Sequence, residues 1–221
     1  MSHLQGKTAL ITGGSRGIGR AIAVRLAEHG VNIVVNYVRH RRDAEETVAA
    51  IEEHGVGCLA IKANVAKEED VQRMFDEIRT NYNSMDILVS NAASGVLKPA
   101  MELTHRHWDW AMDINARAML TLTQHAVPMM KKGGRVLAVS SLGAVRAVPN
   151  YTVVGASKAA LESLVRHLAV ELGPKGITVN TISAGVVDTD ALKKFPNRDD
   201  IIGRSLESEK QDVANPILKE L

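Results

Sequence analysis

The sequence predicts an α/β fold, a single doubly wound parallel sheet with helices on both faces. Short apolar runs alternate along the chain with segments that carry apolar residues at helical spacing. The runs are apolar throughout, as expected for strands buried on both faces of a parallel sheet. The length of 221 residues suits one domain with a sizeable core, so we expect residues 1–221 to form a single domain.

The first half of the chain predicts four strands and three helices. Strands are expected at residues 8–11, 31–37, 57–62 and 87–90, and helices at residues 18–29, 43–54 and 68–82. The first helix has Ile18, Ile22 and Leu26 on one face and ends at Gly30. The third helix has an apolar face made by Val71, Met74, Phe75 and Ile78.

The second half predicts two more strands, at residues 135–140 and 177–182. Helical stretches are expected at residues 105–115 and 116–131, and a long helix at residues 151–172 is closed by Gly173 and Pro174. A short helical piece is expected at residues 213–221, with no closing strand. Ligands bind at the carboxyl ends of the strands in such sheets. Chemistry is therefore expected after Ile11, Tyr37, Lys62, Ser90, Ser140 and Ile182.

Composition and charge exclude several classes of function. A net charge of +2 is too small to favour nucleic acid as a partner. The start of the chain shows no signal peptide, and no apolar run is long enough to span a membrane. Cys58 is the only cysteine, which suits a cytoplasmic protein. We expect no metal, because His105 and His107 would point to different faces of a helix.

A glycine-rich turn lies between the first strand and the first helix. Residues 12–19 read TGGSRGIG, with Gly13, Gly17 and Gly19 at the spacing that lets backbone approach a ligand closely. The N–H groups and the dipole at the start of the following helix favour a pyrophosphate. A tight turn without a ligand would use the same glycines, so this alternative stays open. The position after the first strand favours a dinucleotide site, with Ser15, Arg16 and Ile18 in the same turn.

The residues after the second strand favour NADPH over NADH. An NAD site usually carries a carboxylate there, whereas residues 36–39 read NYVR. Guanidinium groups bind a 2′-phosphate through paired hydrogen bonds, and Arg16 and Arg39 are the two candidates. We expect Arg41 and Arg42 to be solvated members of a charge run.

The chain resembles the short-chain dehydrogenase/reductase family from about Lys7 to Asn197. The marks of the resemblance are residues 12–19, Asn64 with Val65, residues 91–93, Asn115, Ser140 with Ser141, Tyr151 with Lys158, and residues 180–189. The resemblance implies a Rossmann-type sheet, here with its last strand missing. Turn, basic pair and resemblance together give the expected cofactor contacts: Gly13, Ser15, Arg16, Gly17, Ile18, Gly19, Arg39, Asn64, Val65, Asn91, Ala92, Lys158, Val187 and Thr189.

The resemblance also implies the catalytic residues, Tyr151, Lys158, Asn115 and Ser141. Lys158 would hold the ribose hydroxyls and help the tyrosine to release its proton. Asn115 would anchor a water on a proton path. Ser141 occupies the place of the substrate-binding serine of the common form, although a role in stabilising its loop stays open.

The sequence departs from the common form of the family at the catalytic tyrosine. The usual tyrosine stands four residues before the lysine, where this chain has Val154, and Tyr151 stands seven residues before Lys158. On a helix both spacings keep the pair on one face, and the longer one moves the hydroxyl by roughly 4.5 Å along the axis. An acid must stand where negative charge develops. A displaced tyrosine therefore favours reduction of a conjugated C=C bond, in which charge develops on a distant thioester oxygen. A purely structural role for Tyr151 is the alternative.

The seven-residue spacing resembles the enoyl-acyl-carrier-protein reductases, and most closely their NADPH-dependent branch III in fatty-acid synthesis. Residues 91–97, 108–110 and 188–198 carry this closer likeness. The resemblance implies a substrate lid at residues 190–205, with residues 190–202 mobile over the acyl chain. Lys193, Lys194 and Arg198 would meet an acidic carrier protein or form a solvated face. A homo-oligomer, tetramer or dimer, is implied if the short C-terminal end permits it.

These observations predict an NADPH-dependent reductase of trans-2-enoyl thioesters carried by acyl carrier protein or CoA. Hydride would go to the β-carbon, and Tyr151 would stabilise or protonate the enolate. Two alternatives stay open: a 3-oxoacyl or other ketone reductase, and a shortened chain that binds NADPH without turnover.

Overall fold

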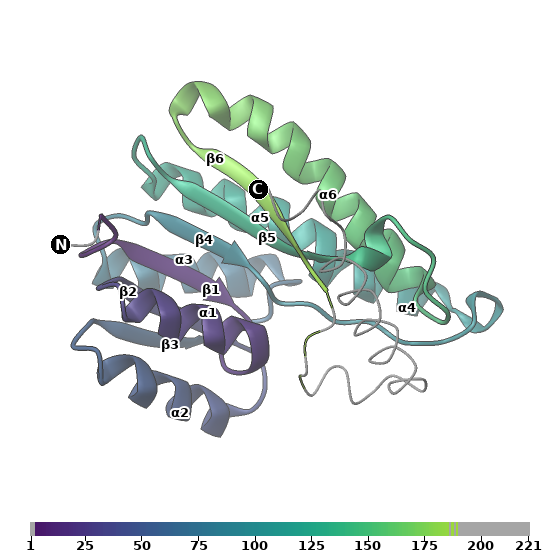
Figure 1. The fold of residues 1–221 in the computed structure, drawn as a ribbon, viewed down its shortest axis with the longest axis horizontal. Coiled ribbons are helices and arrows are strands. Elements are labelled where there is room, and N and C mark those ends of the chain that lie inside the picture. Colours follow the sequence, from purple (N-terminus) through teal and green to yellow (C-terminus); the bar gives the residue numbers. More distant parts are fainter. Residues whose placement is uncertain (1–2, 186, 188, 190–221) are drawn as a thin grey trace, which may run out of the picture. The chain divides into compact units, whose positions relative to one another are not determined.

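Six parallel strands form one sheet of order β3-β2-β1-β4-β5-β6, which confirms the predicted doubly wound fold (Figure 1). The computed structural model describes residues 3–185, 187 and 189. The strands are β1 (Thr8–Thr12), β2 (Asn32–Tyr37), β3 (Cys58–Lys62), β4 (Ile87–Ser90), β5 (Arg135–Ser141) and β6 (Thr178–Ala184).

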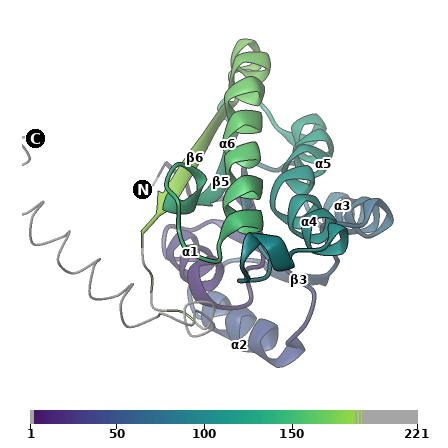
Figure 2. The same cartoon turned by 90° about the vertical axis from the view of Figure 1, so that its right-hand side faces the viewer.

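Helices cover both faces of the sheet, with α1 on one side and α3, α4 and α5 on the other (Figure 2). The α-helices are α1 (Gly17–Ala27), α2 (Arg41–Glu52), α3 (Glu68–Asn81), α4 (His105–Met112), α5 (Ala118–Ala126) and α6 (Thr152–Leu172). Short helical turns are η1 (Ala100–Glu102), η3 (Val127–Met129), η4 (Leu142–Ala144) and η5 (Gly173–Lys175), and η2 (Asp113–Arg117) is a π-helix.

Two apolar clusters hold the helices against the sheet. The larger one packs α3, α5 and α6 onto the strands and includes the predicted apolar face of α3. The smaller one packs α1 and α2 onto the opposite face, with Ile11, Ile33 and Ile51 fully buried. Because each strand is covered on both sides over most of the sheet, its sequence needs no polar alternation.

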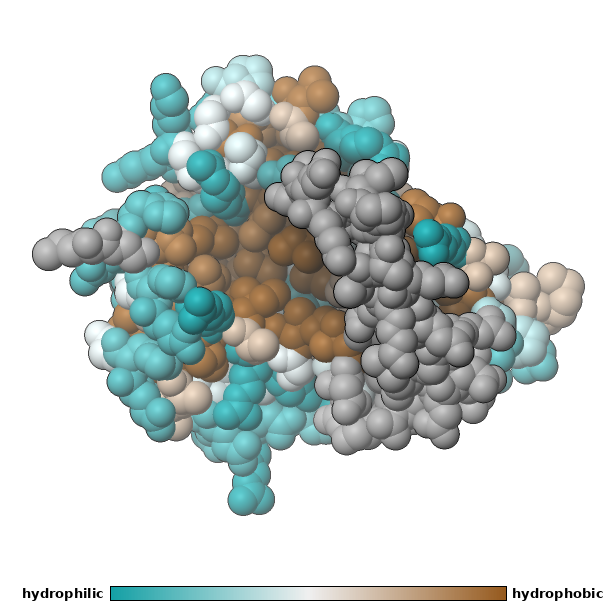
Figure 3. Space-filling view, in the orientation of Figure 1, coloured by the Kyte–Doolittle hydropathy of each residue, from teal (hydrophilic) through white to brown (hydrophobic). Residues whose placement is uncertain are grey.

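One face of β5 and β6 has little helical cover among the described residues. Leu137 of β5 is only partly buried against the α1 and α2 cluster, and Ile182 of β6 is 47% exposed. Figure 3 shows apolar surface in this part of the molecule. Alternation along a strand turns Val136 and Ala138 to the opposite, fully covered face.

Several boundaries differ from the sequence prediction by a few residues, and two of the differences bear on the site. The stretches expected at residues 105–115 and 116–131 are joined by η2, so Asn115 lies in a π-helix rather than at a helix end. The long helix starts at Thr152, not at residue 151, and Tyr151 precedes it with φ −105° and ψ 9°. The helical geometry assumed for Tyr151 is therefore wrong, since its backbone is not helical.

Contacts divide the chain into two units, Met1–Ser183 and Ala184–Leu221. The predicted lid, its basic residues Lys193, Lys194 and Arg198, and the helical piece at residues 213–221 lie outside the described residues. No helix within the described part of the chain has the length and apolar character needed to cross a membrane.

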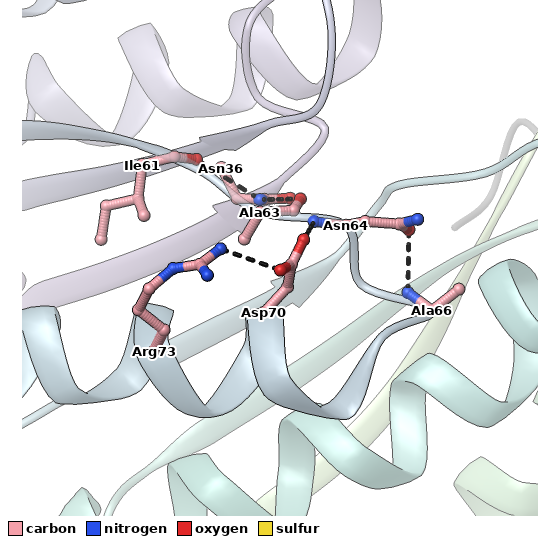
Figure 4. A network of polar contacts seen from close by, with 7 residues as sticks. All are labelled: Asn36, Ile61, Ala63, Asn64, Ala66, Asp70 and Arg73. Carbon is pink, nitrogen blue, oxygen red and sulfur yellow. Dashed lines mark hydrogen bonds and ion pairs between the residues drawn. The ribbon is translucent and has the colours of Figure 1, made fainter.

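Asn36 joins the carboxyl ends of three neighbouring strands, and Figure 4 shows its contacts with Ile61 and Ala63. Its side chain is fully buried. Its Nδ2 donates to the backbone oxygens of Ala63 (2.9 Å) and Ile61 (3.5 Å), while its Oδ1 accepts from the Gly13 N–H (3.4 Å). The glycine-rich turn after β1 is thus tied to the segment that follows β3.

Replacing Asn36 by alanine should lower the free energy of unfolding by about 2 kcal/mol, because the Ala63 carbonyl would lose its partner in a buried position. Urea unfolding of Asn36→Ala measures the change. Asn81→Ala is the matched control, since the Asn81 amide bonds a helix carbonyl at the exposed surface, and it should cost about 0.5 kcal/mol or less. Equal losses in the two variants would contradict the role given to Asn36.

Candidate active site

The glycine-rich turn has the geometry of an anion cradle. Gly13 and Gly17 have φ of +62° and +54°, which glycine adopts without strain. A Cβ on Gly19 would collide with the Gly13 carbonyl, so α1 approaches the turn as closely as backbone allows. The first turn of α1 carries no acidic side chain, and no side chain caps it. These N–H groups and the helix dipole fit a pyrophosphate.

The ends of β1 and β4 are held together by Thr12 and Asn91. The Thr12 hydroxyl accepts from the backbone N–H groups of Asn91 and Ala92, both at 3.0 Å. The Asn91 Nδ2 donates to the carbonyls of Thr12 (2.9 Å) and Gly13 (3.2 Å). The Asn91 side chain therefore fixes the phosphate turn.

Arg16 and Arg39 follow the carboxyl ends of the paired strands β1 and β2, and both side chains are exposed. Arg41 pairs with Glu45 at 2.8 Å and Arg42 with Glu46 at 3.6 Å, each one turn along α2. These exposed helix pairs agree with the solvated role expected for Arg41 and Arg42. Ser15 is buried, and its backbone carbonyl accepts from the Thr47 hydroxyl at 2.9 Å, which ties the glycine-rich turn to α2.

The segment after β3 is held in a fixed shape beside this turn (Figure 4). The Asn64 N–H donates to Asp70 Oδ2 at 2.8 Å, and its Oδ1 accepts from the Ala66 N–H at 3.1 Å. Hydrogen bonding from the Asn64 backbone is the main cause that lowers the pKa of the Asp70 carboxyl, and Arg73 adds to it. The Val65 side chain is buried in the larger core, so only its backbone can meet a nucleotide.

Lys158 is a buried cation on α6, with 5% of its surface exposed. Its Nζ donates to the Val139 carbonyl at 2.6 Å. Burial lowers the pKa of Lys158 from an ordinary 10.5 to about 8. The Lys158 Nζ therefore lies near the carboxyl end of β5, where it can bind a hydroxyl group of a ligand.

The Tyr151 hydroxyl donates to Ser141 Oγ over 3.3 Å. Ser141 ends β5 and caps η4, where its Oγ also accepts from the Gly143 N–H at 3.2 Å. The structure therefore brings three of the four predicted catalytic residues, Tyr151, Ser141 and Lys158, to the carboxyl end of β5.

Val154 fills the place in which the common family form has its tyrosine. It is buried in a small apolar cluster with Ala111 and Val153. A Cβ on Gly95, in the loop after β4, would collide with Val154 Cγ2. This contact makes Val154 a packing residue.

Asn115 connects the loop after β4 to α6. Its Oδ1 accepts from the Ser94 N–H, and its Nδ2 donates to the Ser94 carbonyl and to Ser157 Oγ, each at 2.8 Å. Ser157 in turn donates to the Val154 carbonyl at 2.7 Å. Both N–H groups of the side-chain amide are thus engaged, so any water that Asn115 anchors would bind its backbone or the second acceptor position of Oδ1.

Two expected cofactor residues belong to the second unit. Val187 and Thr189 are described, but they follow Ser183, the last residue of the first unit. Their expected contact with the nicotinamide stays a prediction. Of the other candidates, Gly13, Gly17, Ile18, Gly19, Asn91 and Ala92 all lie at the glycine-rich turn or against it.

Sequence reasoning missed Asn36, Thr12, Gly143 and Gly155. Asn36 could have been noticed as an amide that follows the apolar residues of β2, whose other asparagine, Asn32, starts the strand. Gly143 and Gly155 carry no signal in the local sequence. A side chain is excluded at each only because α6, η4 and the Tyr151 ring approach one another closely.

His107 has a structural role. It closes a capping box with Thr104 at the start of α4, each bonding the backbone of the other.

Comparison with known proteins agrees with this geometry. The sequence profile of the family described as "Enoyl-(Acyl carrier protein) reductase" matches residues 13–212. The chain is also 44% identical over 191 residues to a 1-cyclohexenylcarbonyl-CoA reductase of Streptomyces collinus, a match that covers 86% of this chain and 68% of that protein. The chain belongs to the short-chain dehydrogenase/reductase family. Within this family it is also 36% identical over 190 residues to a tetrahydroxynaphthalene reductase of Pyricularia oryzae, covering 86% and 67% of the two chains.

Solved structures of short-chain dehydrogenases/reductases share the fold. A short-chain dehydrogenase from Burkholderia cenocepacia in complex with NADP has a TM-score of 0.84 at 38% identity, over 89% of this chain and 79% of that one. The angucycline C-6 ketoreductase LanV with bound NADP has a TM-score of 0.85 at 36% identity, over 90% and 81% of the two chains. The chain is thus an NAD(P)-dependent oxidoreductase of this family, and its relatives include an enoyl-CoA-type reductase and ketoreductases.

The buried Lys158 predicts a stability that depends on pH. The unfolded chain holds the Lys158 proton up to pH 10.5, whereas the folded chain releases it near pH 8, so this group adds stability as pH rises between these values. The full difference is about 3 kcal/mol. At pH 7, Lys158→Met should therefore stabilise the cofactor-free protein by about 2 kcal/mol, after loss of the hydrogen bond to Val139.

Urea unfolding of wild type and Lys158→Met at pH 7 and pH 10 measures this effect. The advantage of the variant should shrink strongly at pH 10. Lys175→Met, at an exposed lysine, should show no such dependence. An advantage that stays constant with pH would rule out burial of the charge as its cause.

Proposed function

We propose that this protein uses NADPH to reduce the C=C bond of trans-2-enoyl thioesters. The observation that carries the proposal is the replacement of the usual tyrosine in α6 by Val154, with Tyr151 just before the helix. Val154 is buried in an apolar cluster where the common form has its acid, and the hydroxyl group instead comes from Tyr151, against Ser141.

This arrangement suits a reaction in which charge develops away from the carbon that receives hydride. NADPH, when bound, supplies the hydride to the β-carbon of the substrate. Electrons of the C=C bond then move toward the thioester oxygen, which gains negative charge, and the α-carbon finally takes up a proton from solvent water. On substrate binding, the Tyr151 hydroxyl would turn its proton from Ser141 Oγ to that oxygen and stabilise the charge.

Lys158 and Ser141 would support the tyrosine. The Lys158 ammonium is held at the Val139 carbonyl, from which it would bind the ribose hydroxyls and favour negative charge near Tyr151. The Ser141 Oγ accepts from the Gly143 N–H and from the Tyr151 hydroxyl. Its own proton can therefore be donated to the substrate.

Two similarities support the enoyl assignment. The family profile is described as enoyl-acyl-carrier-protein reductase. The Streptomyces collinus relative is named as a reductase of 1-cyclohexenylcarbonyl-CoA, a name that denotes a thioester carbonyl conjugated with a C=C bond. The proposal includes both acyl carrier protein and CoA as carriers of the enoyl group, together with a role in fatty-acid synthesis.

Ketone reduction is the second candidate, and one observation favours it. The Tyr151 and Ser141 hydroxyls are hydrogen-bonded, so together they could bind a substrate carbonyl. Relatives named as keto-reductases, such as LanV, agree with this alternative.

Oxidation of NADPH should occur with crotonyl-CoA and crotonyl acyl carrier protein, and not with acetoacetyl-CoA. Tyr151→Phe should lower kcat/KM for the crotonyl thioester by about 100-fold or more, because it removes the donor to the developing charge. Tyr82→Phe, at a tyrosine that packs against the larger core, should leave turnover unchanged. Turnover with acetoacetyl-CoA alone would replace the enoyl assignment by ketone reduction.

Removing either guanidinium from the expected 2′-phosphate site should weaken NADPH selectively. Arg16→Ala and Arg39→Ala should each raise the Kd for NADPH by about 10-fold or more, since a charge-assisted hydrogen bond is lost. The Kd for NADH should change little. Arg41→Ala is the control, because Arg41 pairs with Glu45. Fluorescence titration measures both constants, and parallel losses for NADPH and NADH would exclude the phosphate contact.

A further inference from the structure

The Tyr151 ring lies against two glycines, Gly143 of η4 and Gly155 of α6. A Cβ added to Gly143 would collide with the ring at Cε1 and would lie 2.5 Å from Cδ1. A Cβ added to Gly155 would lie 2.6 Å from the Gly143 carbonyl oxygen and 3.6 Å from the ring. We call this pair the glycine slot.

The slot requires glycine for space and not for backbone conformation. Neither Gly143 nor Gly155 is among the glycines with positive φ, so an L-residue could adopt either backbone. What excludes a side chain is the approach of η4, α6 and the tyrosine ring to one another. Alanine at position 143 would therefore displace the ring or the turn.

Packing around the ring has to set the direction of Tyr151, because the helix does not, and the glycine slot shares this role with the apolar cluster that contains Val154. Tyr151 precedes α6 with non-helical backbone, and it is tied to its neighbours by two backbone bonds. Its N–H donates to the Val148 carbonyl at 3.2 Å, and its carbonyl accepts from the Gly155 N–H at 2.7 Å. These bonds fix the backbone but leave the side chain to be positioned by what surrounds the ring.

The turn that carries Gly143 also orients the partner of Tyr151. The Gly143 N–H donates to Ser141 Oγ, which in turn accepts from the Tyr151 hydroxyl. One residue thus both leaves room for the ring and holds the oxygen to which its hydroxyl is bonded.

We propose that Gly143 is a positioning residue for Tyr151, with Gly155 keeping the η4 backbone close to α6. The inference rests on the proposed function only in giving Tyr151 the role of hydrogen-bond donor to the substrate. In this proposal the glycine slot holds the Tyr151 ring in the position from which its hydroxyl reaches the substrate.

The direct test is Gly143→Ala. Displacing the hydroxyl by about 1 Å should lower kcat by about 100-fold. The Kd for NADPH should change by less than about twofold, since the bonds that hold the phosphate turn come from Thr12, Asn36 and Asn91 and none involves Gly143. Gly173→Ala is the matched control, because a Cβ there would meet nothing within 4 Å. Full activity of Gly143→Ala would overturn the proposal.

A double-mutant cycle separates positioning from a general defect. In the Tyr151→Phe background, Gly143→Ala should lower kcat by less than about threefold further, because both changes act through one hydroxyl. Equal losses with and without that hydroxyl would show that Gly143 acts elsewhere and would overturn the proposal. The cycle is run with whichever thioester or ketone the wild type reduces, so failure of the enoyl assignment leaves this test intact.

A thermal cycle gives an outcome without any substrate. Tyr151→Phe should lower the Tm by about 2 °C in the wild type, through loss of the hydrogen bond to Ser141. It should have no effect on top of Gly143→Ala, where that bond is already broken. Equal shifts in both backgrounds would overturn the proposal. If Gly143→Ala does not fold, adding Tyr151→Ala, which removes the ring that the new Cβ meets, should restore folding. A double variant that still fails to fold would overturn the proposal.

Discussion

The junction of β1 with β4 is the constraint on which the rest of the site depends. A parallel sheet brings the carboxyl ends of its strands to one edge, where backbone groups lose their ladder partners. Here the Thr12 hydroxyl and the Asn91 amide satisfy those groups across nearly 80 residues of sequence. The glycine-rich turn is held open in the shape that a pyrophosphate requires, and the loop that leads to Ser94 and Gly95 starts from a fixed point.

Further hydrogen bonds connect this junction to α6, the helix that carries Lys158. Asn115 sits in a π-helix, a form that often marks functional sites, and its amide joins the loop at Ser94 to Ser157 on α6. Ser157 lies next to Lys158, which is buried at the end of β5. Asn115, for which the resemblance implies a place on a proton path, thus connects these elements through its side chain. Burial of the lysine lowers its pKa and destabilises the folded state at neutral pH, a cost that active sites commonly carry.

The sequence predicted the elements well where the signal is local. Apolar periodicity located the strands and α3, and glycine spacing located the phosphate turn, because both depend on backbone conformations within a few residues. The start of α6 and the continuity of α4 with α5 were predicted wrongly. These boundaries are decided by partners far along the chain. The π-helix at Asn115, for example, is accompanied by hydrogen bonds of its side chain to Ser94 and Ser157.

By itself the sequence determined the parallel sheet, the nucleotide turn and the displacement of the tyrosine from position 154 to 151. Only the tertiary structure decided where that tyrosine's hydroxyl lies, because Tyr151 stands outside α6 and its ring is placed by Gly143 and Gly155 rather than by helical geometry. The physical reason is that spacing along a chain fixes direction only within regular backbone. Beyond the end of a helix, direction depends on what packs there.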